Sequence, residues 1–502
     1  MKALRINILL LLVVIFASCD KNAIDIAPIE NNTAGAFYAN EIEVKQAIIG
    51  VYARLGRNGT NTDFATDYFW LISENRSDLL YLGGETSAQN NQLELRKYLV
   101  SGTNSTVSGV FSRLYSMIKD ANSLLAHTKE DEYMRYRAEA RFLRAYAYSE
   151  LVRSFGPVAL ITNPIENEEA VALPRAPLQD IYATIIADLE FAAENLNDFY
   201  TGADAGRVGS VAAKALLGQV YMTMAGYPMN DVTAYEKAES TFANIITAVD
   251  SRFQPDYSKL FILESENKYD LFSIQFASGG QNVGSSLPAY ITNSGSNSTP
   301  YPDWVYNSYT NQGQDLRLDT IFANQMKANG DLRFSVSVDE GYWSDKEHTN
   351  WVERNIITKF LEKDNTQSNI KSWNDFPRNF PILRPADVYL YYAEALIRNG
   401  KAGLAKSYVD KIRTRAGLLA LTASPTLEDI KYERKAEFLG EGRRYFDLVR
   451  WGETEAVDIL SKFALHYHSL TNGQLPTRRD LLLPIPQDEL KTRNNWDQNL
   501  DY

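Results

Sequence analysis

Pairs of amphipathic segments that recur along the sequence constrain the fold of this chain most strongly. In the clearest pair, at 388–412, apolar residues recur at the spacing of one helix face on both sides of the helix-breaking Asn399-Gly400. Three more pairs are found at 108–127 with 131–156, at 182–189 with 217–224, and at 426–441 with 442–460. Because a single helix hairpin cannot bury its apolar face alone, the four hairpins are expected to stack.

Each hairpin combines large aromatic residues with alanine and in this respect resembles a tetratricopeptide-type unit. The distances between the pairs are irregular, and the strict consensus of that repeat is absent. We therefore predict a mostly α fold, in which four tetratricopeptide-like helix hairpins form a scaffold with insertions and not a regular solenoid.

The largest insertion is expected at about 251–381, where helical periodicity fades. Gly, Asn and Ser are frequent there, and LFSIQFA at 271–277 has the pattern of a short strand. A second loop-rich stretch, YLGGETSAQNNQ, lies at 81–92. Loops on a rigid scaffold are where binding sites are usually built. Four of the seven tryptophans of the chain lie in the insertion: Trp304, Trp343, Trp351 and Trp373.

The first 19 residues have the pattern of a secretory signal. Two basic residues precede an apolar run from Ile8 to Ala17, which is too short to span a membrane and is followed by Ser18 and Cys19. Cys19 is the only cysteine, which excludes an internal disulfide and makes it the predicted lipidation site. Phe16 stands where a lipoprotein signal usually has an aliphatic residue. The alternative is an ordinary cut near Ala17 that leaves an unmodified thiol.

The chain is expected to have three parts. These are a lipoprotein signal peptide at 1–18, a lipidated flexible tether at 19–35 and a single domain at 36–502 that includes the insertion. Removal of the signal takes away two positive charges, so the formal net charge becomes −12 − 2 = −14. This negative charge argues against nucleic acid as a partner. Contact with a membrane is expected through the lipid anchor only, because no later apolar run approaches about 18 residues.

Several motifs resemble those of the SusD/RagB family of nutrient-binding outer-membrane lipoproteins. The helical landmarks are AEARFLRAYAYSELVRSFGPVALI at 138–161, LRPADVYLYYAEALIRNG at 383–400 and VDKIRTRAGL at 409–418. KYERKAEFLGEGRRYFDLVRWG at 431–452 and LLLPIPQDEL at 481–490 are similar to the C-terminal signature of the family. The sequence departs from the family only at its end, where QNLDY replaces the usual Gln-Asn-Pro-Gly-Tyr.

The resemblance implies a function and a location. It implies a protein that is lipid-anchored to the outer membrane and faces the cell exterior, where it binds an oligo- or polysaccharide. It also implies a SusC-like TonB-dependent barrel as partner, to which the glycan is delivered for uptake. No catalytic activity, cofactor or metal-binding site is expected, and the presence of a structural cation stays open.

Aromatic residues of the insertion are the first candidates for contacts with a glycan. Pyranose faces stack on flat aromatic rings, and neighbouring polar side chains bind their hydroxyls. The alternative is that these rings form the core of the insertion itself. Tyr81, Asn90 and Asn91 are added because family members often contribute ligand contacts from this N-terminal loop. The candidates in the insertion are Tyr301, Trp304, Tyr306, Trp343 and Trp373.

Other functions remain open from the sequence. The same architecture would serve for peptide capture if its site were a closed chamber of mixed charge. A glycoside hydrolase needs two carboxylates at a defined separation, and no pair stands out among the 63 acidic residues. No GxSxG, HExxH, P-loop or dinucleotide motif is present. In the C-terminal signature, Arg443 and Arg444 could form an anion clamp, but ion pairs within a helix pair are the expected role.

Overall fold

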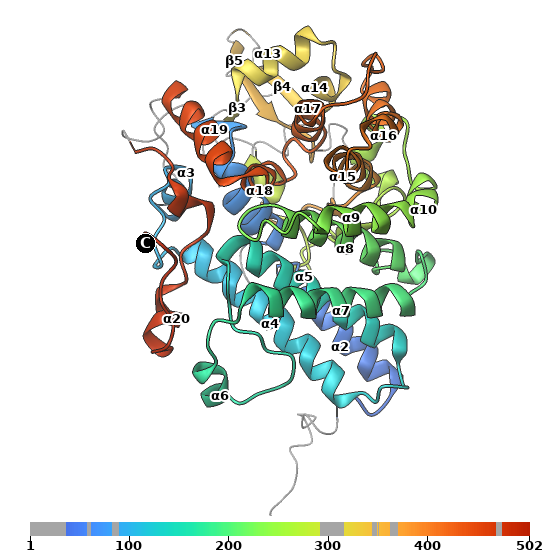
Figure 1. The fold of residues 1–502 in the computed structure, drawn as a ribbon, viewed down its shortest axis with the longest axis vertical. Coiled ribbons are helices and arrows are strands. Elements are labelled where there is room, and N and C mark those ends of the chain that lie inside the picture. The colour runs from blue at the N-terminus through green and yellow to red at the C-terminus, as the bar shows by residue number, and fades with distance from the viewer. Residues whose placement is uncertain are drawn as a thin grey trace, which may run out of the picture.

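The computed structural model describes most of the chain beyond the predicted tether. Its described residues are 37–57, 62–82, 90–291, 316–343, 349, 351–361, 370–467 and 474–502, without the side chains of 90, 342, 343 and 352. Helices dominate, and the strands form only two-stranded antiparallel sheets (Figure 1). This confirms the predicted fold class. No helix among the described residues is both long and apolar enough to cross a membrane.

The N-terminal half of the scaffold is a stack of long helices. α4 (Ser105–His127) and α5 (Met134–Phe155) form the first predicted pair, and α7 (Leu178–Asn195) and α8 (Ser210–Ala225) form the second. α5 packs between α4 and α7, so residues all round it are buried. α2 (Glu41–Ala53) covers α4 and α5 on the outside, and α9 (Ala234–Ala243) packs on α8 (Figure 1).

The C-terminal half contains the other two pairs. α15 (Pro385–Arg398) packs against α16 (Ala402–Arg415) and also against α9, which joins the two halves. α17 (Leu427–Glu437) packs on α15. The second segment of the fourth pair is split into α18 (Arg444–Trp451) and α19 (Glu453–His466), because Gly452 has a φ of 148° that a continuous helix cannot contain.

The insertion contains short strands and helices. β2 (Phe272–Ile274), which lies within the predicted strand segment, pairs with β6 (Phe380–Leu383) and so ties the start of the insertion to its end. β1 (Leu80–Leu82) pairs with β3 (Leu316–Leu318), and β4 (Val338–Trp343) with β5 (Trp351–Ile357). Among its described residues, the insertion contains the α-helices α11 (Leu287–Ile291), α13 (Thr320–Ala328) and α14 (Leu332–Ser337).

Short elements complete the fold between these parts. The π-helix η2 (Ala65–Ser73), the 3-10 helix η3 (Glu74–Arg76) and α3 (Asn90–Arg96) connect α2 to α4. The remaining elements are α6 (Asn167–Ala172), η4 (Gly202–Asp204), α10 (Ile246–Asp250), η5 (Tyr257–Phe261), η6 (Leu263–Ser265), η8 (Arg478–Leu481) and α20 (Gln487–Thr492).

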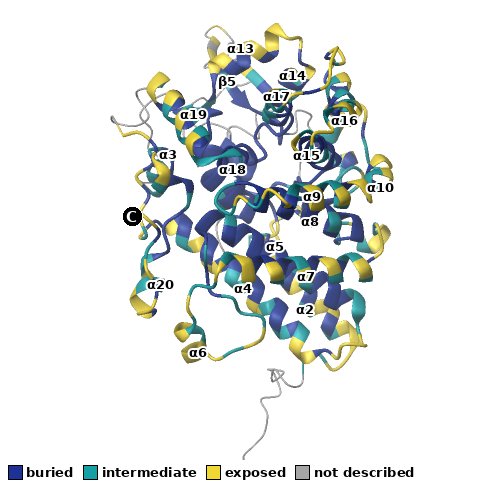
Figure 2. Ribbon diagram, in the orientation of Figure 1, coloured by how far each residue is buried: buried dark blue, intermediate teal, exposed yellow. Residues whose placement is uncertain are grey.

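One large hydrophobic core runs through both halves of the scaffold, and exposed residues lie on the outer helix faces (Figure 2). A group of buried charges borders this core at the end of α17. Glu437 and Glu441 bind Arg384, Arg415 and Lys359 at 2.6 to 2.8 Å. The charges of the C-terminal signature therefore tie separate segments together.

Arg443 and Arg444, which follow in the signature, do not bind the glutamates of their own helix pair. Arg443 donates to the backbone carbonyls of Pro381 and Ile382. The Nε of Arg444 lies 2.7 Å from Asp78. Their role is structural, as expected, but they fasten the helix pair to distant segments of the chain.

Candidate ligand-binding site

A polar pocket of about 530 Å³ lies between α4, α3, η2 and α11. It opens to solvent, and hydroxyl and amide side chains form most of its wall. Such groups donate and accept hydrogen bonds, so the wall suits a ligand with many hydroxyl groups. The hydroxyl and amide residues of the wall are Thr62, Asn91, Gln92, Ser105, Thr106, Ser112 and Ser116.

The buried carboxylate of Asp63 attaches the insertion to the N-terminal wall of the pocket. It accepts hydrogen bonds from the backbone N–H of Ser286 at 2.5 Å and from the hydroxyls of Ser285 and Ser286 at 3.2 and 2.8 Å. The same carboxylate accepts from the N–H of Thr66 at the start of η2. Because α11 begins directly after Ser286, these bonds fix the position of that helix against η2.

Tyr290 of α11 brings the insertion into the pocket wall. Its phenol is hydrogen-bonded to the side chain of Gln92, and burial together with the negative charge of Asp67 raises the pKa of Tyr290 to about 12. The ring of Trp373 packs beside Tyr290, with ring centroids 6.1 Å apart and planes at 53°. Trp373 rests on a small apolar cluster and keeps part of its surface exposed. An aromatic surface therefore adjoins the polar pocket.

An ion pair lies in the wall of the pocket. Nη2 of Arg113 is 3.4 Å from a carboxylate oxygen of Asp67, and the same guanidinium donates to the backbone carbonyls of Gly56 and Thr62. Burial raises the pKa of Asp67 to about 6, although the charge of Arg113 and a hydrogen bond from Thr62 act in the opposite direction. The carboxylate is thus incompletely stabilised, which is common where a side chain faces a ligand.

Asn91 is the predicted residue that lines the pocket. Its amide donates to the hydroxyls of Ser105 and Thr106 at 3.1 and 2.9 Å, so it also holds the first turn of α4. Its neighbour Asn90 begins α3, but the side chain of Asn90 lies outside the described residues. Of the candidates from the insertion, Trp373 is brought to the same place by its contact with Tyr290.

Tyr81 lies in strand β1 and not in the pocket wall. Its ring stacks on that of Tyr467, with centroids 4.0 Å apart and an angle of 9° between the planes. The hydroxyl of Tyr467 donates to Asp319, and the strand partner of Tyr81 is Arg317. One face of the Tyr81 ring is therefore covered by the protein itself, and its contact with a ligand stays a prediction.

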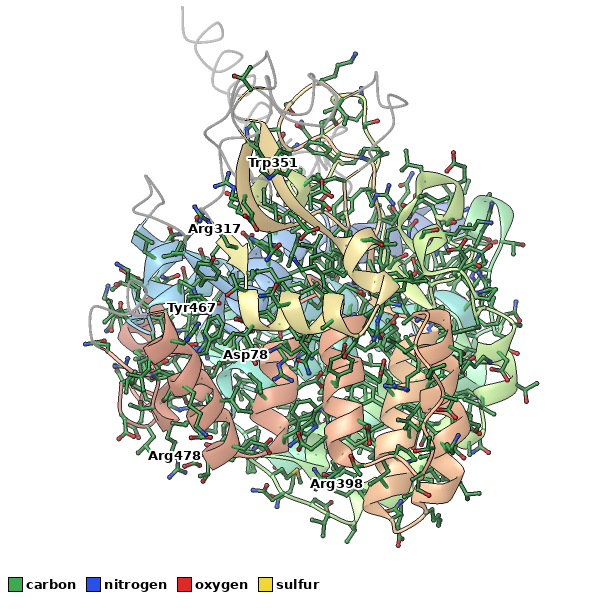
Figure 3. All side chains as sticks on the ribbon, turned by 90° about the horizontal axis from the view of Figure 1, so that it is seen from above. Asp78, Arg317, Trp351, Arg398, Tyr467 and Arg478 are labelled. Carbon is green, nitrogen blue, oxygen red and sulfur yellow. The ribbon has the colours of Figure 1, made fainter. Side chains whose placement is uncertain are left out.

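The side chains of the other aromatic candidates lie outside the described part of the structure. Tyr301, Trp304 and Tyr306 lie outside the described residues, and of Trp343 only the backbone in β4 is described. The strand register pairs Trp343 with Trp351, whose side chain is 45% exposed at the start of β5 (Figure 3). Their roles in binding stay predictions.

Most residues of the pocket wall were not among the candidates from the sequence, including four whose side chains define its charge and its contact with the insertion. Asp67, Gln92, Arg113 and Tyr290 lie on three helical segments and one short turn of helix, and nothing in their local sequence separates them from scaffold residues. The only signals were the position of Tyr290 in the aromatic-rich insertion and that of Gln92 at the end of the loop-rich stretch 81–92. Among the described residues, no group of three or more His, Cys, Asp or Glu side chains is arranged to hold a metal ion.

Comparisons with known proteins agree on one family. The model of the SusD family matches residues 261–502, and a SusD-like model described as starch-binding associating with outer membrane matches residues 37–222. A SusD-like protein of Bacteroides ovatus is 27% identical over 461 residues, covering 87% of this chain and 80% of its own. The starch-binding protein SusD of Bacteroides thetaiotaomicron is 26% identical, and the match covers 96% of this chain and 95% of that protein.

A solved structure of a laminarin-binding SusD-like protein has the same fold. It superimposes with a TM-score of 0.76 at 25% identity and covers 93% of this chain and all of its own. The matches span both halves of the scaffold and the insertion. The chain therefore belongs to the SusD/RagB family, as its sequence motifs predicted.

Proposed function

We propose that this protein captures an oligo- or polysaccharide at the cell surface and delivers it to a SusC-like TonB-dependent barrel for uptake. The observation that carries the proposal is the partly exposed Trp373 beside Tyr290, next to a pocket of hydroxyl and amide side chains. An aromatic face stacks on the C–H surface of a sugar ring, while the polar wall exchanges hydrogen bonds with its hydroxyls. Both requirements of a glycan are met in one place.

The open shape of the site suits capture followed by release. The pocket is accessible from solvent and its charged groups are paired with one another, Arg113 with Asp67 and Arg54 with Asp120. Binding then depends on stacking and neutral hydrogen bonds, which give moderate affinity and rapid dissociation. A ligand held in this way can pass to a transporter without a chemical step.

The names of relatives support a glycan as ligand. A relative that covers nearly the whole chain is a starch-binding protein, and a structure with the same fold is of a laminarin-binding protein. The matched description of association with the outer membrane fits the proposed lipid anchor at Cys19. We infer the same surface location, with the anchor as the membrane attachment and the barrel as the partner.

Capture of a peptide is the second candidate. The observation in its favour is the mixed charge of the pocket, where Arg54, Arg113 and Asp67 all contribute to the wall. Peptide carboxylates and amines pair with such groups. The glycan is preferred because these charges already have partners within the protein and hydroxyl side chains are more numerous in the wall.

A binding screen of residues 20–502 against polysaccharides and peptides tests the proposal. Binding to one polysaccharide class without cleavage of the chain supports it. Binding to peptides alone would replace the glycan by the second candidate, and release of shortened products would show an enzyme. For the ligand found, Trp373→Ala should weaken binding by about 1 to 3 kcal/mol, measured by titration calorimetry.

Trp351→Ala is the matched control for that variant. Trp351 is also a partly exposed tryptophan of the insertion, but it lies on the β4–β5 hairpin, whereas Trp373 packs beside Tyr290 of the pocket wall. We expect its loss to leave the affinity unchanged. Full affinity in Trp373→Ala together with lost affinity in Trp351→Ala would move the site to the hairpin.

A further inference from the structure

A second pocket, of about 370 Å³, lies against the outer side of α2. Residues 54–57 lie between the two pockets, since Arg54 lines the polar pocket and Arg57 lines this second pocket. Its wall is mainly apolar, and Ile49 and Val283 remain 50% and 49% exposed. The apolar side chains of this wall are Ile49, Tyr52, Ala53, Leu55, Ile274 and Val283.

The apolar surface of this pocket continues along α2. Ile42 is 71% exposed and lies on the same helix face as Lys45 and Ile49, at spacings of three and seven residues. The opposite face of α2 is buried in the hydrophobic core. α2 therefore has apolar residues on both faces, and nothing in the described part of the chain covers the outer one.

We propose that residues 24–29 of this same chain, IDIAPI, lie along the outer face of α2 and place an isoleucine in the second pocket. Ile24, Ile26 and Ile29 are the only large apolar residues between Cys19 and residue 36. Three such residues within six positions are unusual for a segment that is otherwise polar. They provide apolar side chains that can cover the exposed Ile42 and Ile49 of α2.

The length of the intervening chain permits this arrangement. Tyr38 is fixed to the end of α4, where its ring stacks on His127 and its hydroxyl bonds to Ser123. The eight residue steps from Ile29 to residue 37 span up to about 27 Å, more than the roughly 20 Å length of α2. In an extended chain, Ile26 and Ile29 are about 10 Å apart, which matches the rise from Ile42 to Ile49.

Charge also favours this segment. The outer face of α2 and the rim of the second pocket carry two basic residues, Lys45 and Arg57, while a third at the rim, Arg207, is already paired with Glu139 and Asp204. Asp25 lies between Ile24 and Ile26, and Glu30 follows Ile29. Asp25 then faces a basic rim while its neighbours contact the apolar wall.

The arrangement has a consequence for the anchored protein. With residues 24–29 held on α2, only the four residues 20–23 remain between Cys19 and the held segment, and the five steps from Cys19 to Ile24 span at most about 17 Å. The end of α2 near the second pocket would stay beside the membrane. This consequence depends on the proposed lipid anchor, whereas the contact with α2 does not.

Cysteine cross-linking in residues 20–502 tests the contact, because this segment contains no cysteine of its own. Ile24→Cys and Ile26→Cys are each combined with Val283→Cys. We expect an intramolecular disulfide in at least one combination under mild oxidation, detected by mass spectrometry after proteolysis. The control combines Ile26→Cys with Leu419→Cys, since Leu419 is 86% exposed and does not line the second pocket, and it should not cross-link.

A second measurement does not depend on disulfide geometry. Replacing Ile24, Ile26 and Ile29 by Ser should lower the melting temperature and increase hydrogen exchange in α2, while glycan affinity stays unchanged because the polar pocket is separate. Absence of both the cross-link and the exchange effect overturns the proposal. Cross-links only between two molecules would assign the face to a second copy. Loss of barrel co-purification in Ile49→Ser, without a cross-link, would assign it to the transporter.

Discussion

Two sets of buried charges in this molecule have opposite properties. In the scaffold, Glu441 is completely buried and has two cations at 2.7 Å, Arg384 and Lys359. In the pocket wall, Asp67 has Arg113 at 3.4 Å and retains some exposure. The scaffold carboxylate is thus closely surrounded by positive charge, and the pocket carboxylate is not.

The pKa values follow the difference in partners. Burial acts to raise the pKa of both carboxyls, but in Glu441 the charges of Arg384 and Lys359 outweigh it and the pKa is lowered. In Asp67 burial prevails and the pKa rises to about 6. The comparison teaches that the pKa of a buried carboxyl depends on how fully nearby cations compensate for the loss of solvent, which they do at Glu441 and not at Asp67.

The largest expected effect is on stability, from Glu441→Gln. The variant leaves Lys359 and Arg384 buried with less negative charge, which typically costs about 3 to 5 kcal/mol of unfolding free energy. Chemical denaturation at pH 7 measures this loss. Because the folded pKa of Glu441 is lowered, its contribution is present above the ordinary pKa of a glutamate and disappears as the pH falls below it.

The matched control is Asp458→Asn, which removes the acid of an exposed ion pair with Lys462. We expect it to change stability by less than about 1 kcal/mol, since solvent screens such pairs. Equal effects of the two variants would contradict the structural role of the buried network.

The next largest effect, from Asp67→Asn, should be a gain of stability and not a loss. Asp67→Asn removes a carboxylate whose ionised form is disfavoured, so we expect the variant to be more stable than the original protein at pH 8, by about 1 to 2 kcal/mol. The raised folded pKa makes this gain complete above pH 6 and causes it to vanish as the pH falls towards 4. Melting temperatures of both proteins across this pH range test the sign. A loss of stability at pH 8 would show that Arg113 depends on Asp67 as the scaffold cations depend on Glu441.

The smallest effect is expected for Tyr81→Ala, on the affinity of the protein for its glycan. Because Tyr467 covers one face of the Tyr81 ring, the variant should change the dissociation constant for the glycan by less than about twofold, which is below 0.5 kcal/mol. It should cost about 0.5 to 1.5 kcal/mol of stability through the lost ring contact. A tenfold loss of affinity would extend the site from the pocket to β1.

Most of the scaffold was predictable because helix hairpins are local structures. The stripes at 388–412 predicted α15 and α16 with their break at Asn399, and the segments at 108–127 and 131–156 predicted α4 and α5. The split at Gly452 was not predicted, since it depends on one backbone angle inside a segment of continuous helical pattern.

The site was less predictable because it depends on contacts between distant segments. Asp63 and Ser286 are separated by 223 positions, and no local pattern indicates that they meet. Without that contact, Tyr290 cannot be assigned to the pocket wall that contains Asn91, nor can its neighbour Trp373 be placed beside this wall. Sequence could nominate Asn91 and Trp373 by residue type and position, but only tertiary structure brings them together.

The hydrogen bonds of Asp63 bear on how such a protein changes its ligand during evolution. They secure the base of α11 to η2 through residues 63, 66, 285 and 286 alone. Substitutions and length changes elsewhere in the insertion can therefore accumulate while this part of the pocket wall keeps its position. A lineage of such proteins can acquire new specificities by changing the rest of the insertion on an inherited frame.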